Sequence, residues 1–405
     1  MQIKLIRNSL LAFFVIGFFF FPRLQTIWIS ACFITVLGDK SFYKSLVHGY
    51  SNKLGILLFV YFAWMSISLV YTENLTAGLK SLETKFSLAI FPLFLPFLFS
   101  AEWVKRNIMK LFLTSGLFYI IVSLFDATLD YYSTNSTASF FYSKLGIGLF
   151  QEGSFIHPTY SAFFYNVLVS YLGVQIIEKS SRIRSKSLVL FQFILICVFI
   201  FLLSSKFGIL ALAVNLILLL GYYIKKRKKI IPAVVIFLLF SVLSVLIISQ
   251  SPLKKRFAAS YSALTTQSDK PSSTKARLDV WAETYEIILE NSIFGVGTGD
   301  IRDELMSKYQ EKEYFLYQKR GYDSHQQFLQ TFASLGVLGF VILIAIFVTL
   351  FRQSITTHNF LLFSFTLLFL LFGLVESMLE RQAGVVFFVF FGLYLFNNNP
   401  LKEAK

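Results

Sequence analysis

The sequence predicts an all-α polytopic membrane protein with about twelve transmembrane helices. Of its 405 residues, 56% are hydrophobic, 49 are Phe and only 15% are charged, well below the roughly 25% of a soluble domain. The apolar residues form long runs separated by short basic segments. We therefore expect a single membrane domain over residues 1–405, and we attribute the net charge of +15 to membrane topology rather than to nucleic-acid binding.

Twelve apolar stretches approach the roughly 20 residues that a helix needs to cross a bilayer. They are about 5–21, 24–38, 54–70, 84–100, 108–125, 159–178, 188–205, 207–224, 231–249, 326–351, 359–376 and 383–397. No small-residue cleavage site follows Phe21, so the first stretch is expected to be an uncleaved span. Pro92 and Pro96 should kink the fourth stretch. Cys32 and Cys197 both lie in apolar runs, which excludes a disulfide framework and leaves no metal-ligand spacing.

The distribution of Lys and Arg sets the orientation. With the N-terminus inside, every basic cluster, including the run 225–229, falls in a cytoplasmic segment. Both termini are then cytoplasmic, and two long loops, 126–158 and 250–325, lie outside.

The larger outer loop, 250–325, contains two predicted helices, about 277–290 and 300–319. In the first, Val280, Trp281, Tyr285, Ile288 and Leu289 fall near one face, with acidic residues opposite. Amphipathic helices flanked by spans are expected to lie on the membrane surface.

His325 and Arg277 are the leading site candidates. A neutral imidazole at the start of a span could accept a proton from a sugar hydroxyl. The alternative is an interfacial histidine behind a Ser324 cap, which position alone favours. Arg277 could bind phosphate oxygens with its guanidinium or pair with a surface carboxylate.

Lys206 interrupts an apolar stretch, where a lipid-buried cation would be costly. It is either a lysine at the outer turn between two spans or a second cation for a diphosphate. The glycine-rich run 295–299 could cradle an anion, but a turn ending the first loop helix is the favoured interpretation because no strand precedes it.

Two further groups lie at outer ends of spans. Glu376 and Glu380 either line a cavity or form a structural ion pair, for which Arg381 is the obvious local partner. His157, with Tyr160 close by, either lines the same cavity or belongs to the interfacial aromatic belt.

Together these features resemble the O-antigen ligase and O-antigen polymerase superfamily of bacterial envelope glycosyltransferases. The resemblance covers about 188–397 and rests on Ser205-Lys206 with Gly208-Ile209-Leu210, Arg277 with Trp281, the segment 291–299, Ser324-His325-Gln326, Leu329 and Gly336-Val337-Leu338-Gly339. Two positions depart from the family pattern, which usually has Arg where this chain has Lys206 and Asn where it has Gln326.

The resemblance implies a GT-C-like enzyme of the bacterial inner membrane with its active site on the periplasmic face. Its donor would be a glycan on undecaprenyl diphosphate. Its acceptor would be lipid A–core in a ligase or another lipid-linked repeat unit in a polymerase. Transfer would be inverting and independent of metal or other cofactor. Arg277 and Lys206 would bind the diphosphate, and His325 would activate the acceptor.

Two other classes of function remain open from the sequence. A lipid-linked glycan flippase also has about twelve spans, but it should carry ionisable residues near mid-membrane, which these spans almost lack. A non-catalytic scaffold would tolerate loss of His325 and Arg277.

Overall fold

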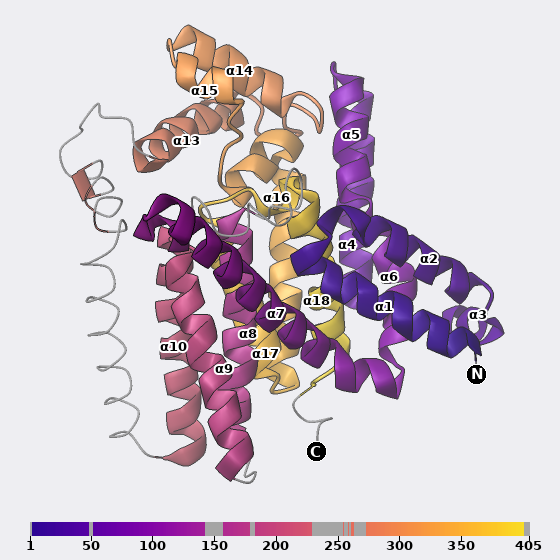
Figure 1. The fold of residues 1–405 in the computed structure, drawn as a ribbon. Coiled ribbons are helices and arrows are strands. Elements are labelled where there is room, and N and C mark those ends of the chain that lie inside the picture. The colour runs from indigo at the N-terminus through magenta and orange to yellow at the C-terminus, as the bar shows by residue number, and fades with distance from the viewer. Residues whose placement is uncertain are drawn as a thin grey trace. The chain divides into compact units, whose positions relative to one another are not determined.

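The computed structural model describes residues 2–47, 52–141, 157–178, 183–228 and 273–400, with isolated positions between 254 and 262. All the regular structure in these ranges is helical, which confirms the predicted fold class (Figure 1). Seven of the described helices are long and apolar enough to cross a membrane, and four shorter apolar helices accompany them. Eleven of the predicted spans coincide with one of these helices, whereas 231–249 lies outside the described residues.

The first compact unit comprises residues 1–48, 97–257 and 398–405. Its helices are α1 (Gln2–Phe20), η1 (Pro22–Leu24), α2 (Gln25–Leu37), α3 (Lys40–Val47), α7 (Glu102–Thr134), η3 (Thr137–Phe140), α8 (Pro158–Glu178), α9 (Ile183–Leu202) and α10 (Lys206–Arg227). α8 is buried along almost its whole length and packs against α7, α9 and α10. α7 continues through Thr134, beyond the expected span 108–125, and ends where Asn135 turns left-handed at φ 50°.

The second unit comprises residues 49–96 and 258–397. Its apolar helices are α4 (Lys53–Ile67), α6 (Ser87–Phe99, in this unit up to Pro96), α16 (Gln327–Thr356), α17 (Phe360–Gly373) and α18 (Gln382–Asn397). Its more polar elements are η2 (Ser68–Val70), α5 (Leu75–Lys85), α13 (Ser273–Glu290), α14 (Ile301–Glu311), α15 (Phe315–Arg320) and η4 (Met378–Glu380). α16 packs against α4, α13 and α17, which makes it the central helix of this unit.

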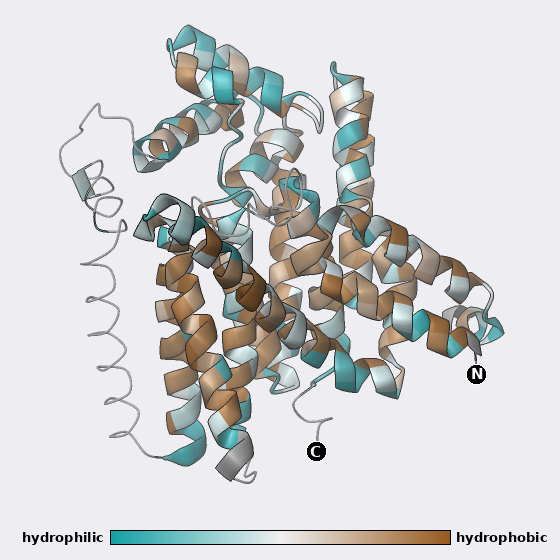
Figure 2. Ribbon diagram, in the orientation of Figure 1, coloured by the Kyte–Doolittle hydropathy of each residue, from teal (hydrophilic) through white to brown (hydrophobic). Residues whose placement is uncertain are grey.

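The polar helices of the second unit match the predicted loop helices. α13 contains the expected helix 277–290, and α14 and α15 divide the expected helix 300–319. Figure 2 shows the difference in character: α9 and α10 are brown over most of their length, whereas α13, α14 and α15 mix teal with brown.

The predicted apolar face of α13 was partly wrong. Val280 and Ile288 are buried as expected, but Tyr285 and Leu289 are exposed and Glu283 is buried. The buried side of α13 faces α14 and α16 through one apolar cluster: Val280, Ile287, Ile288, Ile301, Leu305, Tyr309 and Ala333. Which side of a helix is buried depends on the neighbours that it contacts. Because α13 contacts two helices, its own hydrophobic periodicity does not predict the buried side fully.

Candidate active site

The glycine-rich run 295–299 fills a break in α16. Gly336 leaves the helical conformation at φ 64°, ψ −167°. There the Val296 and Gly297 amides donate to the Ala333 and Ser334 carbonyls, both at 2.9 Å. A Cβ on Gly336 would lie 2.1 Å from the Ile293 carbonyl oxygen, so only glycine fits. These amides are used within the protein, which favours the structural interpretation of this run over an anion cradle.

α13, the segment before α16 and the loop between α17 and η4 bring three ionisable groups into one row. An Nη2 of Arg277, in α13, lies 3.7 Å from Oε2 of Glu376. The other oxygen of that carboxylate, Oε1, lies 3.6 Å from Nδ1 of His325. Glu376 is 8% exposed, so its carboxylate is held in a largely desolvated place between the Arg277 guanidinium and the His325 imidazole. The structure therefore brings Arg277, His325 and Glu376 together from segments far apart in the sequence.

His325 has an unusual backbone. Its φ of 46° is left-handed, a conformation that costs a non-glycine residue free energy and that often marks a functional site. Its amide donates to Oδ1 of Asp323 at 2.8 Å, which holds the turn in place. Nδ1 lies 3.5 Å from the same oxygen and is buried without a hydrogen-bond partner. The imidazole thus faces two carboxylates, each slightly beyond hydrogen-bond distance.

These surroundings set the protonation of the site. Burial by itself lowers the pKa of His325, but the interaction with Glu376 and the charges of Asp323 and Glu376 outweigh it. Its pKa is therefore raised above its usual value, although nearby Arg277 opposes the rise. Burial also raises the pKa of the Asp323 carboxyl, against the charge of His325.

Hydrogen bonds connect the loop that carries Glu376 to the start of α16 and the residues before it. The Ser377 hydroxyl donates to Oδ1 of Asp323 at 3.3 Å, and the Leu379 amide donates to Oε1 of Gln327 at 2.6 Å. The N-cap of α16 is Gln326, whose side chain accepts from the Leu329 amide, and not Ser324 as the alternative interpretation of His325 expected.

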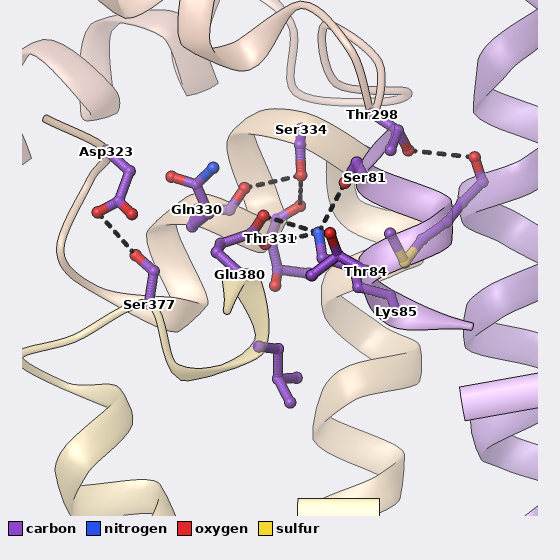
Figure 3. Close-up of polar contacts among 12 residues, drawn as sticks. Ser81, Thr84, Lys85, Thr298, Asp323, Gln330, Thr331, Ser334, Ser377 and Glu380 are labelled. Atoms are coloured by element: carbon purple, nitrogen blue, oxygen red, sulfur yellow. Dashed lines mark hydrogen bonds and ion pairs between the residues drawn. The ribbon is translucent and has the colours of Figure 1, made fainter. Parts of the chain in front are cut away.

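A buried ion pair supports this loop from α5. Both carboxylate oxygens of Glu380 accept from Nζ of Lys85, at 2.7 and 2.8 Å, and Ser81 accepts from the same ammonium at 3.1 Å (Figure 3). Lys85 is 6% exposed. Arg381, the expected local partner of Glu376 and Glu380, forms neither pair and is exposed. That expectation was wrong because the nearest cation in the sequence is not the nearest in space.

Lys85 is a site-supporting residue that the sequence did not single out. It stands between the polar helix α5 and an apolar span. A lysine at such a boundary must either extend its ammonium to the membrane surface or pair with a carboxylate. Its position at the start of an apolar span was therefore the feature of the sequence that could have indicated a partner.

The remaining candidates lie in the first unit. Ser204 turns left-handed at φ 52°, and Ser205 caps α10, so Lys206 is the first residue of that helix. His157 precedes α8, is exposed, and accepts with its carbonyl from the Tyr160 amide.

The three candidates Lys206, His157 and Tyr160 lie at the same end of the helix pair α8 and α10. Gly208 in α10 packs against Ala162 in α8, so the N-termini of both helices lie together. Arg277, His325 and Glu376 belong to the second unit, and convergence of the two groups stays a prediction.

No group of three or more His, Cys, Asp and Glu side chains is arranged to hold a metal ion within the residues that the structure describes. The predicted independence of metal stays a prediction.

The fold and the charged row define a polytopic helical membrane protein whose site candidates lie at the ends of its spans and on the polar helices beside them. Residues 191–344 match the family model described as O-antigen ligase. The match confirms the predicted superfamily for this stretch of the chain. It contains Lys206, Arg277 and His325 but ends before Glu376.

A relative from Haemophilus influenzae, described only as an uncharacterized protein, is 26% identical over 140 residues. The match covers 33% of this chain and 35% of that protein, so the chain spans about a third of the relative's length.

Proposed function

We propose that this protein moves a glycan from undecaprenyl diphosphate to a sugar hydroxyl of lipid A–core at the periplasmic face of the bacterial inner membrane. The observation that carries the proposal is the row in which Glu376 lies between Arg277 and His325. It supplies a phosphate-binding guanidinium and a candidate base on either side of one buried carboxylate. The match of residues 191–344 to the O-antigen ligase family model supports the reaction class.

His325 acts as the base through Nε2, because Nδ1 faces Asp323 and Glu376. As the acceptor oxygen attacks the anomeric carbon, its proton passes to Nε2. The bond from that carbon to the diphosphate oxygen breaks, and the electron pair leaves with the diphosphate. Asp323 and Glu376 stabilise the imidazolium that forms, as carboxylates do beside other catalytic histidines.

Arg277 stabilises the negative charge that grows on the leaving diphosphate. Before the donor binds, the guanidinium lies beside Glu376 at 3.7 Å, longer than a hydrogen bond and open to a better anion. Once phosphate takes that place, the Glu376 carboxylate interacts mainly with His325. Donor binding thereby strengthens the base. Lys206 supplies a second cation in this proposal, with one point charge in place of the family's bidentate arginine.

The second candidate is a repeat-unit polymerase, which the matched domain supports equally well. Purified full-length protein in lipid nanodiscs is given the lipid-linked glycan with either lipid A–core or further lipid-linked repeat units. Transfer to lipid A–core alone supports the ligase, and chain extension alone identifies a polymerase. Absence of transfer to both acceptors contradicts the proposal.

A further inference from the structure

We propose that Tyr322, Arg320 and Arg302 form the acceptor subsite, and that it takes a sugar bearing a carboxylate or phosphate group. The inference rests on the proposed function. It concerns the side of His325 away from Arg277, to which neither the sequence motifs nor the family match assigns a role.

The charged row continues beyond His325. The Tyr322 ring meets the imidazole edge-to-face, with centroids 5.1 Å apart and planes at 72°. The Tyr322 hydroxyl accepts from Nη1 of Arg320 at 2.8 Å, and the Arg320 Cζ lies 6.0 Å from the ring centroid. The order of contacts is therefore Arg277, Glu376, His325, Tyr322 and Arg320.

A second guanidinium lies at the same place. Gly321, between Arg320 and Tyr322, adopts φ 59° and ends α15. A Cβ there would lie 2.5 Å from an Nη2 of Arg302, so that guanidinium packs directly over the glycine. Arg302 of α14 therefore lies against Gly321, and Arg320 of α15 contacts the neighbouring half-buried Tyr322.

These two arginines differ from the other cations nearby. Lys275 pairs with Asp279, and Lys308 lies 2.8 Å from Glu290. Arg302 and Arg320 are exposed and enter no ion pair among the residues described. Unpaired guanidinium groups attract and hold anionic groups with directed hydrogen bonds.

The stereochemistry of an inverting transfer indicates that the acceptor binds at the Tyr322 end of the row. In an inverting displacement the nucleophile and the leaving group lie on opposite faces of the sugar ring. If the diphosphate is held by Arg277, the acceptor must enter on the far side of His325. That side is formed by Tyr322 and Arg320. Tyr317, stacked on the Tyr322 ring at 5.7 Å, fixes the orientation of that ring beside His325.

The test is acceptor-dependent transfer by full-length protein in nanodiscs at saturating donor. The double variant R302Q/R320Q should raise the KM for phosphate-bearing lipid A–core about tenfold or more, because two charge-assisted hydrogen bonds are lost. Its kcat and donor KM should not change. R302K/R320K should recover part of the affinity. The matched control is R352Q, an exposed arginine at the other end of α16.

The acceptor is also varied. Removing its phosphates, or reducing its carboxyl groups, should raise the wild-type KM for whichever group the arginines bind and leave the double variant unaffected. An unchanged acceptor KM in R302Q/R320Q overturns the inference. So does an effect that disappears in zwitterionic nanodiscs, because the arginines would then bind lipid headgroups.

Failure of the proposed function is recognised separately, as absence of transfer by the wild type. Binding of soluble phosphorylated core oligosaccharide to the wild type and to R302Q/R320Q then decides the subsite. Weaker binding by the variant supports it, and equal binding rejects it.

Discussion

Polar groups are arranged differently in two regions: the interface of α8 and α10, and the junction of α5, α13, α16 and η4. At the first, neutral amides join the helices: the Asn166 side chain donates to the Gly208 carbonyl at 3.2 Å, and Asn215 donates to the Asn166 carbonyl at 2.8 Å. At the second, charged groups are drawn together from distant segments. Neutral pairs suffice to hold the first pair of helices together, and the charged groups of the second place agree with the function proposed for them.

The largest difference should appear when the buried charge of the Lys85–Glu380 pair is removed. Lys85→Met leaves Glu380 without its partner and should lower the free energy of unfolding by about 3–5 kcal/mol. Asn215→Leu, in the neutral interface, should cost no more than about 2 kcal/mol. Both values are measured by denaturant titration in detergent. The double variant K85M/E380L should regain most of the loss, and equal losses in all three would contradict the comparison.

The next effect is on activity. Glu376→Gln keeps the shape of the side chain but removes the charge between Arg277 and His325. We expect transfer to fall about 100-fold, the usual scale for a group that stabilises charge in a transition state, with stability nearly unchanged. The rate of glycan transfer and the unfolding midpoint are measured together. A loss of stability with an unchanged rate would make Glu376 structural only.

Two glycines give a smaller contrast. Gly336→Ala forces a left-handed alanine against the Ile293 carbonyl and should destabilise the protein by about 1–3 kcal/mol. Gly221 in α10 has no atom within 4 Å of the position of an added Cβ, so Gly221→Ala should be neutral or stabilising by up to about 1 kcal/mol. Thermal unfolding compares the two, and equal effects would show that the break in α16 carries no strain.

The smallest expected effect is on pH dependence. His325 must be neutral to act as base, so activity should be lost as pH falls through its raised pKa. The Asp323 charge contributes to that rise, so Asp323→Asn should lower the pKa of His325 and move the acid limb of kcat/KM to lower pH. A pH profile from about 5 to about 9 shows the shift. Movement to higher pH would contradict the electrostatic role of Asp323.

The sequence located most of the helices because length and hydropathy determine spans locally. It also located Arg277, His325 and Glu376 as candidates. The sequence could not show which charged residues pair in space. The partner of Glu380, for example, is Lys85, 295 residues away, and not the adjacent Arg381. The break at Gly336 was equally hidden, because a glycine inside an apolar run is compatible with a continuous helix until the 291–299 segment is seen to fill it.

The most direct test of the central claim is the single-turnover rate of glycan transfer in His325→Ala. His358→Ala is the matched control, since His358 also has a left-handed backbone (φ 51°) and is exposed beyond the other end of α16. We predict that H325A loses about 100-fold or more while its unfolding midpoint stays near that of the wild type, and that H358A keeps the wild-type rate. A rate for H325A within twofold of the wild type would contradict the role of His325 as base.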